Sequence, residues 1–171
     1  MRAIIAGLLE RCLGSRGIPP KAARSRRPKI APRGRHFHLG EILDRINRDC
    51  FGGEVTAAIT WGRRPARRPR RSIRLGSYRR GKNLIRIHPA LDAEFVPSCV
   101  VEALVHHEML HAVIPVRTGR NGRRVVHGRD FRIRERRFHG YRRAEKWCRE
   151  NIGLLLRPSR SPSAGGGSPG C

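Results

Sequence analysis

One segment of the chain is both long and apolar enough to form a buried helix, so the rest of the molecule has to fold around it. Residues 95–116, with the sequence FVPSCVVEALVHHEMLHAVIPV, contain no Lys or Arg. The Pro97-Ser98 pair is typical of a helix start, and Pro115 stops the pattern because proline cannot continue a helix. The sequence therefore predicts a long core helix that opens near Pro97-Ser98 and closes near Pro115.

Shorter periodic segments surround this helix. Apolar side chains at helical spacing in residues 39–46 predict an earlier helix, which Gly52-Gly53 would end. Three short strands are expected, over residues 54–62, 72–78 and 83–89. After a basic loop at 117–126, a final helical region contains the large aromatic side chains Phe131, Phe138 and Trp147. The pattern predicts an α+β fold in which a small three-stranded sheet packs on the core helix, with flanking helices.

The two ends of the chain have compositions that do not build a core. Residues 1–35 combine prolines with many basic side chains, so we predict a flexible basic arm there. Residues 157–171 are rich in Gly, Ser and Pro, which is typical of a disordered tail. The folded domain is therefore expected over residues 36–156.

Cysteine usage and the N-terminal sequence favour a reducing cytoplasm. The five cysteines are scattered and form no CxxC pair, so neither a disulfide framework nor a zinc ribbon is indicated. The opening sequence reaches Glu10 and Arg11 before any small-residue cleavage site, which is a poor match to a signal peptide. No run approaches the roughly 20 apolar residues of a membrane span, so we expect no membrane partner.

The charge balance indicates a polyanionic partner. The chain has 38 Lys and Arg against 13 Asp and Glu, for a net charge of +25, and such an excess favours nucleic acid bound through its phosphates. Arginines concentrate in residues 61–80 and 117–143. The candidate nucleic-acid contacts are Arg63, Arg64, Arg67, Arg68, Arg70, Arg71, Arg123 and Arg124. A solvated basic surface in an Arg-rich protein is the alternative.

A specific chemistry is indicated by residues 107–111, whose sequence HEMLH is an HExxH motif inside the predicted core helix. Positions i and i+4 project from one face of a helix, so His107 and His111 can bind one Zn²⁺. Glu108 lies beside them, where a carboxylate can act as a general base. Two buried core histidines beside an unrelated glutamate are the alternative.

The distribution of charge along the chain also favours a cation near this motif. No Lys or Arg lies between Arg86 and Arg117. The same stretch contains the acids Asp92, Glu94, Glu102 and Glu108. Basic side chains near Zn²⁺ would oppose its binding by direct repulsion. A core helix excludes charge in any case, so burial explains the gap equally well.

A catalytic zinc site usually has three protein ligands, and the third has the candidates His127, Glu135 and His139. The metzincin position, six residues after His111, is Arg117, which excludes that class. His127 is favoured because Gly128 allows a close backbone approach and a helix can start directly after it.

Two further polar residues near the motif are expected to have other roles. Glu135 lies in the sequence RIRERR, which is typical of a solvated helix face. His106 projects about 100° away from His107 on the helix, so we expect it to pack or to support the ligands.

Together these residues resemble the SprT-like metallopeptidase family, whose relatives include the Spartan-type proteases of DNA–protein crosslink repair. The resemblance covers residues 36–150 and rests on FGG followed by ITWGRR, on LGSY and LIRIHPALD, on VEALVHHEMLHA, and on HGRDF. It implies a zincin-like fold, zinc ligands at His107, His111 and His127, and Glu108 as the catalytic acid/base. Many members also have a zinc ribbon with paired cysteines, which this sequence does not contain.

Both lines of reasoning predict a zinc metalloendopeptidase, with one Zn²⁺ per chain, that hydrolyses nucleic-acid-associated proteins. The sheet would bind an extended substrate by strand addition, and Tyr78 and Tyr141 are candidates for a second oxyanion donor. One alternative is a non-enzymatic nucleic-acid- or ribosome-binding protein with a vestigial zinc site. The other is a general zinc peptidase without a DNA role.

Overall fold

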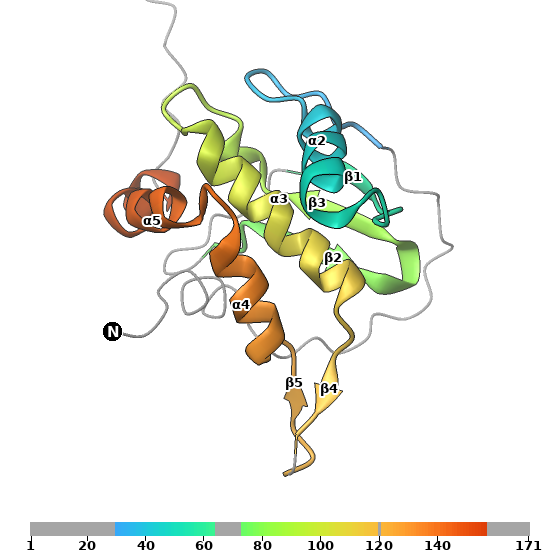
Figure 1. Ribbon diagram of the computed structural model, residues 1–171. Helices are drawn as coiled ribbons and strands as arrows, with labels where there is room; N and C mark the ends of the chain where they lie inside the picture. Colours follow the sequence, from blue (N-terminus) through green and yellow to red (C-terminus); the bar gives the residue numbers. More distant parts are fainter. Residues whose placement is uncertain (1–29, 64–72, 120, 157–171) are drawn as a thin grey trace, which may run out of the picture.

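The computed structural model describes residues 30–63, 73–119 and 121–156, which form an α+β fold as predicted (Figure 1). Its helices are α2 (Leu39–Phe51), α3 (Ser98–Val113), α4 (Arg129–Arg137) and α5 (Tyr141–Leu156). Its strands are β1 (Ala58–Trp61), β2 (Gly76–Arg79), β3 (Leu84–Ile87), β4 (Arg117–Thr118) and β5 (Arg124–Val125). Two 3-10 turns flank β3, namely η1 (Arg80–Lys82) and η2 (Pro89–Leu91).

Most of the predicted arm at 1–35, and all of the predicted tail at 157–171, lie outside the described residues. The last residues of the predicted arm contact the domain. The backbone N–H of Ala31 donates to Thr60 Oγ1 on β1 at 2.9 Å. The Asp92 carboxylate accepts, at 2.6 to 3.2 Å, from the backbone N–H groups of Arg35, His36 and Phe37. These contacts tie the segment before α2 to the sheet and to the loop before α3.

Helix α2 confirms the helix expected for residues 39–46. At its start, His38 Nδ1 accepts from the backbone N–H of Glu41 at 3.2 Å and so caps the first turn. At its end, Gly52 has a positive φ of 59°, a left-handed conformation that glycine adopts without steric cost. The side chains that α2 buries are Leu39, Leu43, Ile46 and Phe51.

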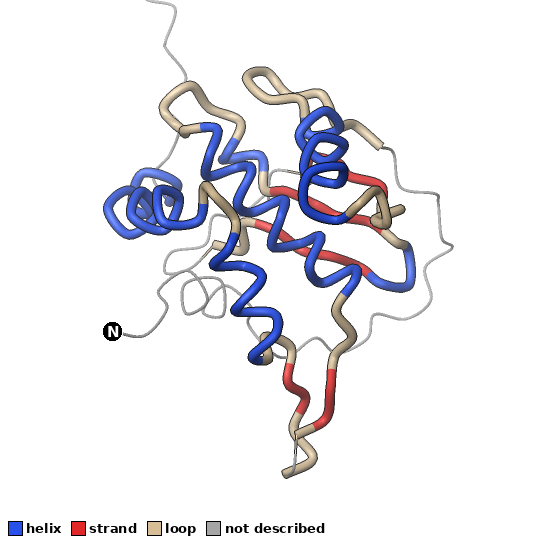
Figure 2. The backbone as a smooth tube through the Cα atoms, viewed as in Figure 1, coloured by secondary structure: helices blue, strands red, loops and turns tan. Residues whose placement is uncertain are grey.

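The three-stranded sheet is mixed and has the strand order β1-β3-β2. Strand β1 runs parallel to β3, with Ala58 opposite Leu84, whereas β2 pairs antiparallel to β3, with Tyr78 opposite Ile85. Helices α2 and α3 pack on one face of this sheet (Figure 2). Strand β2 lies at an edge, and none of the described residues extends the sheet beyond it.

Strand β1 is shorter than the strand predicted for residues 54–62, because it starts only at Ala58. The Asn47 side chain on α2 binds the backbone of Val55, donating from Nδ2 to its carbonyl at 2.9 Å and accepting from its N–H at 3.1 Å. These backbone groups therefore pair with a helix side chain instead of a neighbouring strand.

Helix α3 confirms the predicted core helix. It contacts the other three helices and both β2 and β3, which explains why it is apolar on nearly every face. Val101, Val105 and Met109 are fully buried in it. Neither α3 nor any other described helix combines the length and apolarity needed to cross a membrane.

The chain after α3 differs from the prediction in two places. The basic loop expected at 117–126 contains a short two-stranded hairpin, β4–β5, with Thr118 opposite Arg124, and this hairpin projects from the body (Figure 1). The single helical region expected next is divided into α4 and α5 at Phe138, whose ψ of 127° is extended. The buried Phe138 ring stacks on His106 of α3, so packing of this ring redirects the chain between the two helices.

Candidate metal centre

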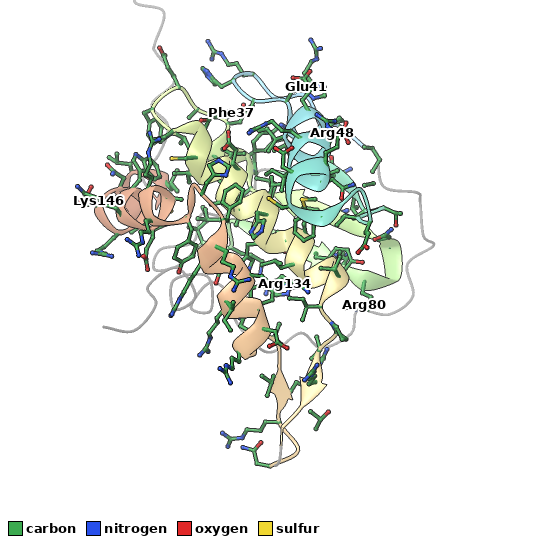
Figure 3. All side chains as sticks on the ribbon, viewed as in Figure 1. Phe37, Glu41, Arg48, Arg80, Arg134 and Lys146 are labelled. Atoms are coloured by element: carbon green, nitrogen blue, oxygen red, sulfur yellow. The ribbon has the colours of Figure 1, made fainter. Side chains whose placement is uncertain are left out.

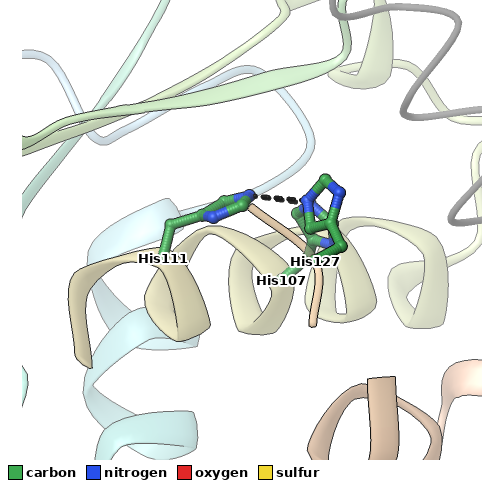
Figure 4. A group of neighbouring side chains, drawn as sticks. All are labelled: His107, His111 and His127. Carbon is green, nitrogen blue, oxygen red and sulfur yellow. Dashed lines mark hydrogen bonds between the residues drawn. The ribbon is translucent and has the colours of Figure 1, made fainter. Parts of the chain in front are cut away.

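Three histidines from separate parts of the chain converge beside α3 (Figure 4). His107 and His111 lie one turn apart on α3, and His127 lies between the β4–β5 hairpin and α4. The Nε2 atom of His111 is 3.1 Å from Nε2 of His107 and 3.1 Å from Nε2 of His127. The structure thus brings together the three residues that the sequence selects as metal ligands.

The spacing of these nitrogen atoms suits a tetrahedral cation. For bonds of about 2.0–2.1 Å, two corners of a tetrahedron are about 3.3–3.4 Å apart, which is close to the separations of 3.1 Å. The ligand atoms of the three rings all lie within 4.8 Å of one another. Three imidazoles with one open position are an established donor set for catalytic Zn²⁺. The group could therefore hold a metal ion.

The protons on the rings also favour a cation among them. His107 Nδ1 lies 2.7 Å from Glu135 Oε1 and donates to it, which leaves a lone pair on His107 Nε2. Burial, with smaller contributions from the neighbouring His107 and His127, lowers the pKa of His111 to about 3, so this ring is neutral. A neutral ring cannot satisfy two close Nε2 neighbours with one proton. A cation that accepts a lone pair from each ring removes this conflict.

Glu135 contradicts the prediction of a solvated position. It is 3% exposed and contacts His107, whereas the arginines around it on α4 are exposed. Burial raises the pKa of Glu135 to about 7, although its electrostatic interactions with His127 and Arg136 act in the opposite direction. Glu135 is not a member of the ligand group but lies behind His107. A carboxylate in this position fixes the tautomer and orientation of a ligating histidine.

Replacing Glu135 with glutamine is expected to weaken zinc affinity about 10- to 100-fold, the usual cost of losing a partner behind a metal ligand. The three histidines remain, so the site should still fill at high zinc concentration. Competition with a chromogenic chelator measures the change. Glu150→Gln on the exposed face of α5 is the matched control and should bind zinc as the wild type does. Equal affinity in both variants would contradict the supporting role of Glu135.

One aromatic ring, that of Phe131, packs against the group of histidines. The buried ring of Phe131, the last residue of HGRDF, has its centroid 4.6 to 5.0 Å from all three imidazoles, those of His107, His111 and His127. His106 points elsewhere and stacks on Phe138 at 4.6 Å, with Phe51 at 5.3 Å. Burial lowers the pKa of His106 to about 4, so it packs as a neutral ring. The sequence indicates the packing role of His106 but not the platform formed by Phe131.

Glu108 extends from α3 to the edge strand β2. A Cβ atom at Gly76 would lie 2.5 Å from Glu108 Oε1, so only glycine leaves room for this carboxylate. Burial raises the pKa of Glu108 to about 8, while the positive charge of Arg74 and a hydrogen bond from the backbone N–H of Tyr78 lower it. The position of Gly76 in LGSY therefore requires glycine because a larger residue would collide with Glu108, a contact that the sequence does not reveal.

A cleft of about 260 Å³ opens at this place. Its lining includes the side chains His107, Glu108 and His111 from α3, together with Gly76, Ser77 and Tyr78 from β2. The carboxyl group of Glu108, two candidate metal ligands and an open strand edge thus share one solvent-accessible space.

Three arginines also line this cleft, namely Arg74, Arg80 and Arg124. The absence of basic residues between Arg86 and Arg117 predicts that no Lys or Arg side chain lies near α3. This prediction is wrong, because arginines from other parts of the sequence fold back towards the helix. The Arg80 guanidinium lies at the C-terminal end of α3 and donates to the carbonyls of His111 at 3.1 Å and Ile114 at 3.4 Å (Figure 3). The last carbonyls of a helix have no partner within it and attract a cation.

The other residues singled out by the sequence lie in different places. Arg63 is exposed after β1, and Arg123 and Arg124 are exposed on the hairpin. The other predicted nucleic-acid contacts lie outside the described residues, namely Arg64, Arg67, Arg68, Arg70 and Arg71. His139 is exposed and lies 3.9 Å from Glu102, apart from the histidine group.

Neither tyrosine hydroxyl is placed to donate into the cleft. The Tyr78 hydroxyl donates to Asn83 Oδ1 at 2.9 Å. The Tyr141 hydroxyl is buried, and Tyr141 does not line the cleft.

The fold and the site together define a class of protein. A small mixed sheet beside a helix that contains HExxH, with a further histidine from a later segment, is a zincin-like arrangement. The family model described as the SprT-like family matches residues 39–147, from α2 into α5, and includes all three histidines. The chain belongs to the SprT-like family. No curated protein and no solved structure gives a significant match.

Proposed function

We propose that this protein is a zinc-dependent metalloendopeptidase that acts on nucleic-acid-associated proteins. The observation that supports this most directly is the meeting of three histidine Nε2 atoms beside the cleft that His107, His111 and Glu108 line. Membership of the SprT-like family supports the same reading. A site that only holds a metal for stability is normally closed by four protein ligands, whereas catalysis needs an open position.

In this proposal His107, His111 and His127 hold the metal, and Glu108 moves the proton. Bound Zn²⁺ supplies a Lewis acid that polarises a carbonyl and lowers the pKa of water to about 7. Glu108 takes the proton from the attacking water and returns it to the leaving amine as the peptide bond breaks. The backbone N–H of Tyr78 donates a hydrogen bond that orients the Glu108 carboxylate, and Gly76 leaves room for this carboxylate beside β2.

The substrate would bind as an extended strand. Strand β2 has an edge that none of the described residues covers, and its residues Gly76, Ser77 and Tyr78 line the cleft. Main-chain hydrogen bonds to such an edge capture an extended peptide with little dependence on its side chains. A segment bound there would pass Glu108 and the histidine group.

Metal content and proteolysis test this proposal together. The purified full chain should contain about one Zn²⁺, cleave an unfolded protein such as casein, lose activity with a chelator and regain it with zinc. A protein that is free of metal and takes up none on refolding with zinc would contradict the site. Zinc uptake without any cleavage, in the presence or absence of DNA, would favour the non-enzymatic binding protein.

Binding to DNA should be independent of sequence and steeply dependent on salt. Each neutralised phosphate contributes a log–log slope of about −0.9, so six contacts lose on the order of 10³-fold in affinity between about 50 and 200 mM salt. Neutralising Arg63, Arg64, Arg67 and Arg68 together should flatten this slope by up to about four contacts. Fluorescence anisotropy with a labelled duplex measures both quantities.

A variant with the same change in net charge separates local contacts from overall attraction. The exposed residues suited to this control are Arg33, Arg35, Arg48 and Arg149. Their replacement by glutamine should change the slope less than the first set does. Weak binding that does not respond to salt, or cleavage of a DNA-bound protein that is the same in both variants, would favour a general peptidase without a DNA role.

A further inference from the structure

The cleft beside the histidine group has an unusual balance of charge for a site next to a cation. Its lining contains three guanidinium groups, those of Arg74, Arg80 and Arg124, and a single carboxylate, that of Glu108. Glu108 is 3% exposed, and its carboxylate packs against Gly76 of β2. A bound divalent ion would add further positive charge. A ligand that enters this space therefore meets an excess of positive charge and no exposed acidic group from the lining.

The arginines are placed on both sides of the point where a bound strand would pass Glu108. Arg74 precedes Gly76 by two residues, a separation of about 6.6 Å in extended chain, and its charge reaches the Glu108 carboxylate. Arg80 follows β2 and is held at the end of α3 by two carbonyls. Arg124 enters from the β4–β5 hairpin, on a separate segment.

One of these groups, the Arg80 guanidinium, is positioned in advance of any ligand. Arg80 is fixed by hydrogen bonds to His111 and Ile114, and its charge is close enough to lower the pKa of His111. A guanidinium held in this way loses little side-chain entropy when a carboxylate arrives.

We propose that the cleft selects substrate segments that have acidic side chains next to the scissile peptide bond, with Arg74 and Arg124 as the specificity-determining residues. This inference rests on the proposed peptidase function and names the substrate class for the same site. Carboxylates of aspartate or glutamate on an extended peptide match the planar donors of arginine. Basic side chains at these positions would be repelled by the same groups.

The size of the cleft favours a peptide over a nucleic acid as its occupant. A space of about 260 Å³ accommodates a few side chains of a peptide but not a nucleic-acid duplex. The edge of β2 offers backbone N–H and C=O groups that pair with those of a peptide strand. A phosphate backbone has no such alternating donors and acceptors. The exposed arginines elsewhere remain available for phosphate contacts.

A set of three matched peptides tests this proposal on the zinc-loaded full chain. The peptides differ only in the residues flanking the cleavage site, which are glutamate, glutamine or lysine. We expect the glutamate peptide to exceed the glutamine peptide about fivefold in kcat/KM, mainly through KM, and the lysine peptide to be poorer than both. Arg74→Gln and Arg124→Gln should each reduce this preference towards one.

Arg149→Gln is the matched control, because Arg149 is an exposed α5 residue that does not line the cleft. It should leave the preference among DNA-free peptides unchanged. Equal cleavage of all three peptides by the wild type would overturn this inference and leave the peptidase function standing. An equal loss of preference in Arg149→Gln would assign the effect to net charge and would also overturn it.

A binding measurement keeps the inference testable if no peptide is cleaved, an outcome that would count against the peptidase function itself. Labelled glutamate and glutamine peptides are titrated with the Glu108→Gln chain and followed by anisotropy. Tighter binding of the glutamate peptide supports the acidic preference, and equal binding overturns it. If a short single-stranded oligonucleotide displaces the glutamate peptide and loses affinity in Arg74→Gln, the cleft binds phosphate and the proposal is wrong.

Discussion

Glu108→Gln is expected to lower kcat/KM by about 10² to 10⁴-fold, the contribution typical of a positioned general base, while the chain still folds and binds one zinc ion. Glutamine keeps the shape of the side chain and still accepts the hydrogen bond from the backbone N–H of Tyr78. It cannot take a proton from water. Replacing a carboxylate that is 3% exposed by a neutral amide also removes a buried ionisable group, so thermal stability should not fall.

Glu102→Gln is the matched control for this prediction. Glu102 lies on the same helix, and its carboxylate is 2.8 Å from Arg45, away from the cleft. Its loss should cost less than about 1 kcal/mol of stability and leave turnover close to that of the wild type. Hydrolysis of a quenched fluorescent peptide, with zinc content measured on the same samples, gives both results. Turnover by Glu108→Gln at the control level would remove Glu108 from the mechanism.

His127→Ala is expected to abolish tight zinc binding. One of three ligands disappears, so we expect a loss of more than about 10³-fold, beyond the 10- to 100-fold typical of a residue behind a ligand. The effect should exceed that of Glu135→Gln for the same reason. Equilibrium dialysis against a chelator of known affinity measures the dissociation constant, and circular dichroism shows whether the fold persists.

His139→Ala provides the comparison, because the His139 side chain is 70% exposed and lies outside the histidine group. It should bind zinc like the wild type. If His127→Ala retains zinc while Glu135→Gln loses it, then Glu135 is the third ligand and the protein belongs with the glutamate-type zincins.

Local patterns predicted the main elements of this fold well. Helix α2 ends at Gly52 and α3 starts at Ser98, as glycine and proline signals indicated. Such signals act within a few residues, so a sequence contains them in full. Strand β1 was predicted too long because the pairing of Val55 with Asn47 depends on how α2 packs on the sheet. The hairpin β4–β5 was missed because its charged strands lack an apolar alternation.

The sequence by itself determined which residues are candidate metal ligands. HExxH on an apolar helix places His107 and His111 on one face, because the helical period alone sets that geometry. Gly128 before α4 allowed His127 to be chosen as a third ligand, and the structure brings its Nε2 within 3.1 Å of that of His111. These inferences depend on local geometry and on the chemistry of side chains.

Only the tertiary structure decided what surrounds those residues. Glu135 lies in a run of arginines in the sequence, but the fold places its Oε1 atom 2.7 Å from His107 Nδ1. The fold set Gly76 against Glu108, and it brought Arg80 onto the end of α3, a helix that itself contains no Lys or Arg. Each of these contacts joins residues about 28 to 32 positions apart. Their partners are chosen by the packing of helices and strands against each other, a long-range competition for buried space that no local periodicity encodes.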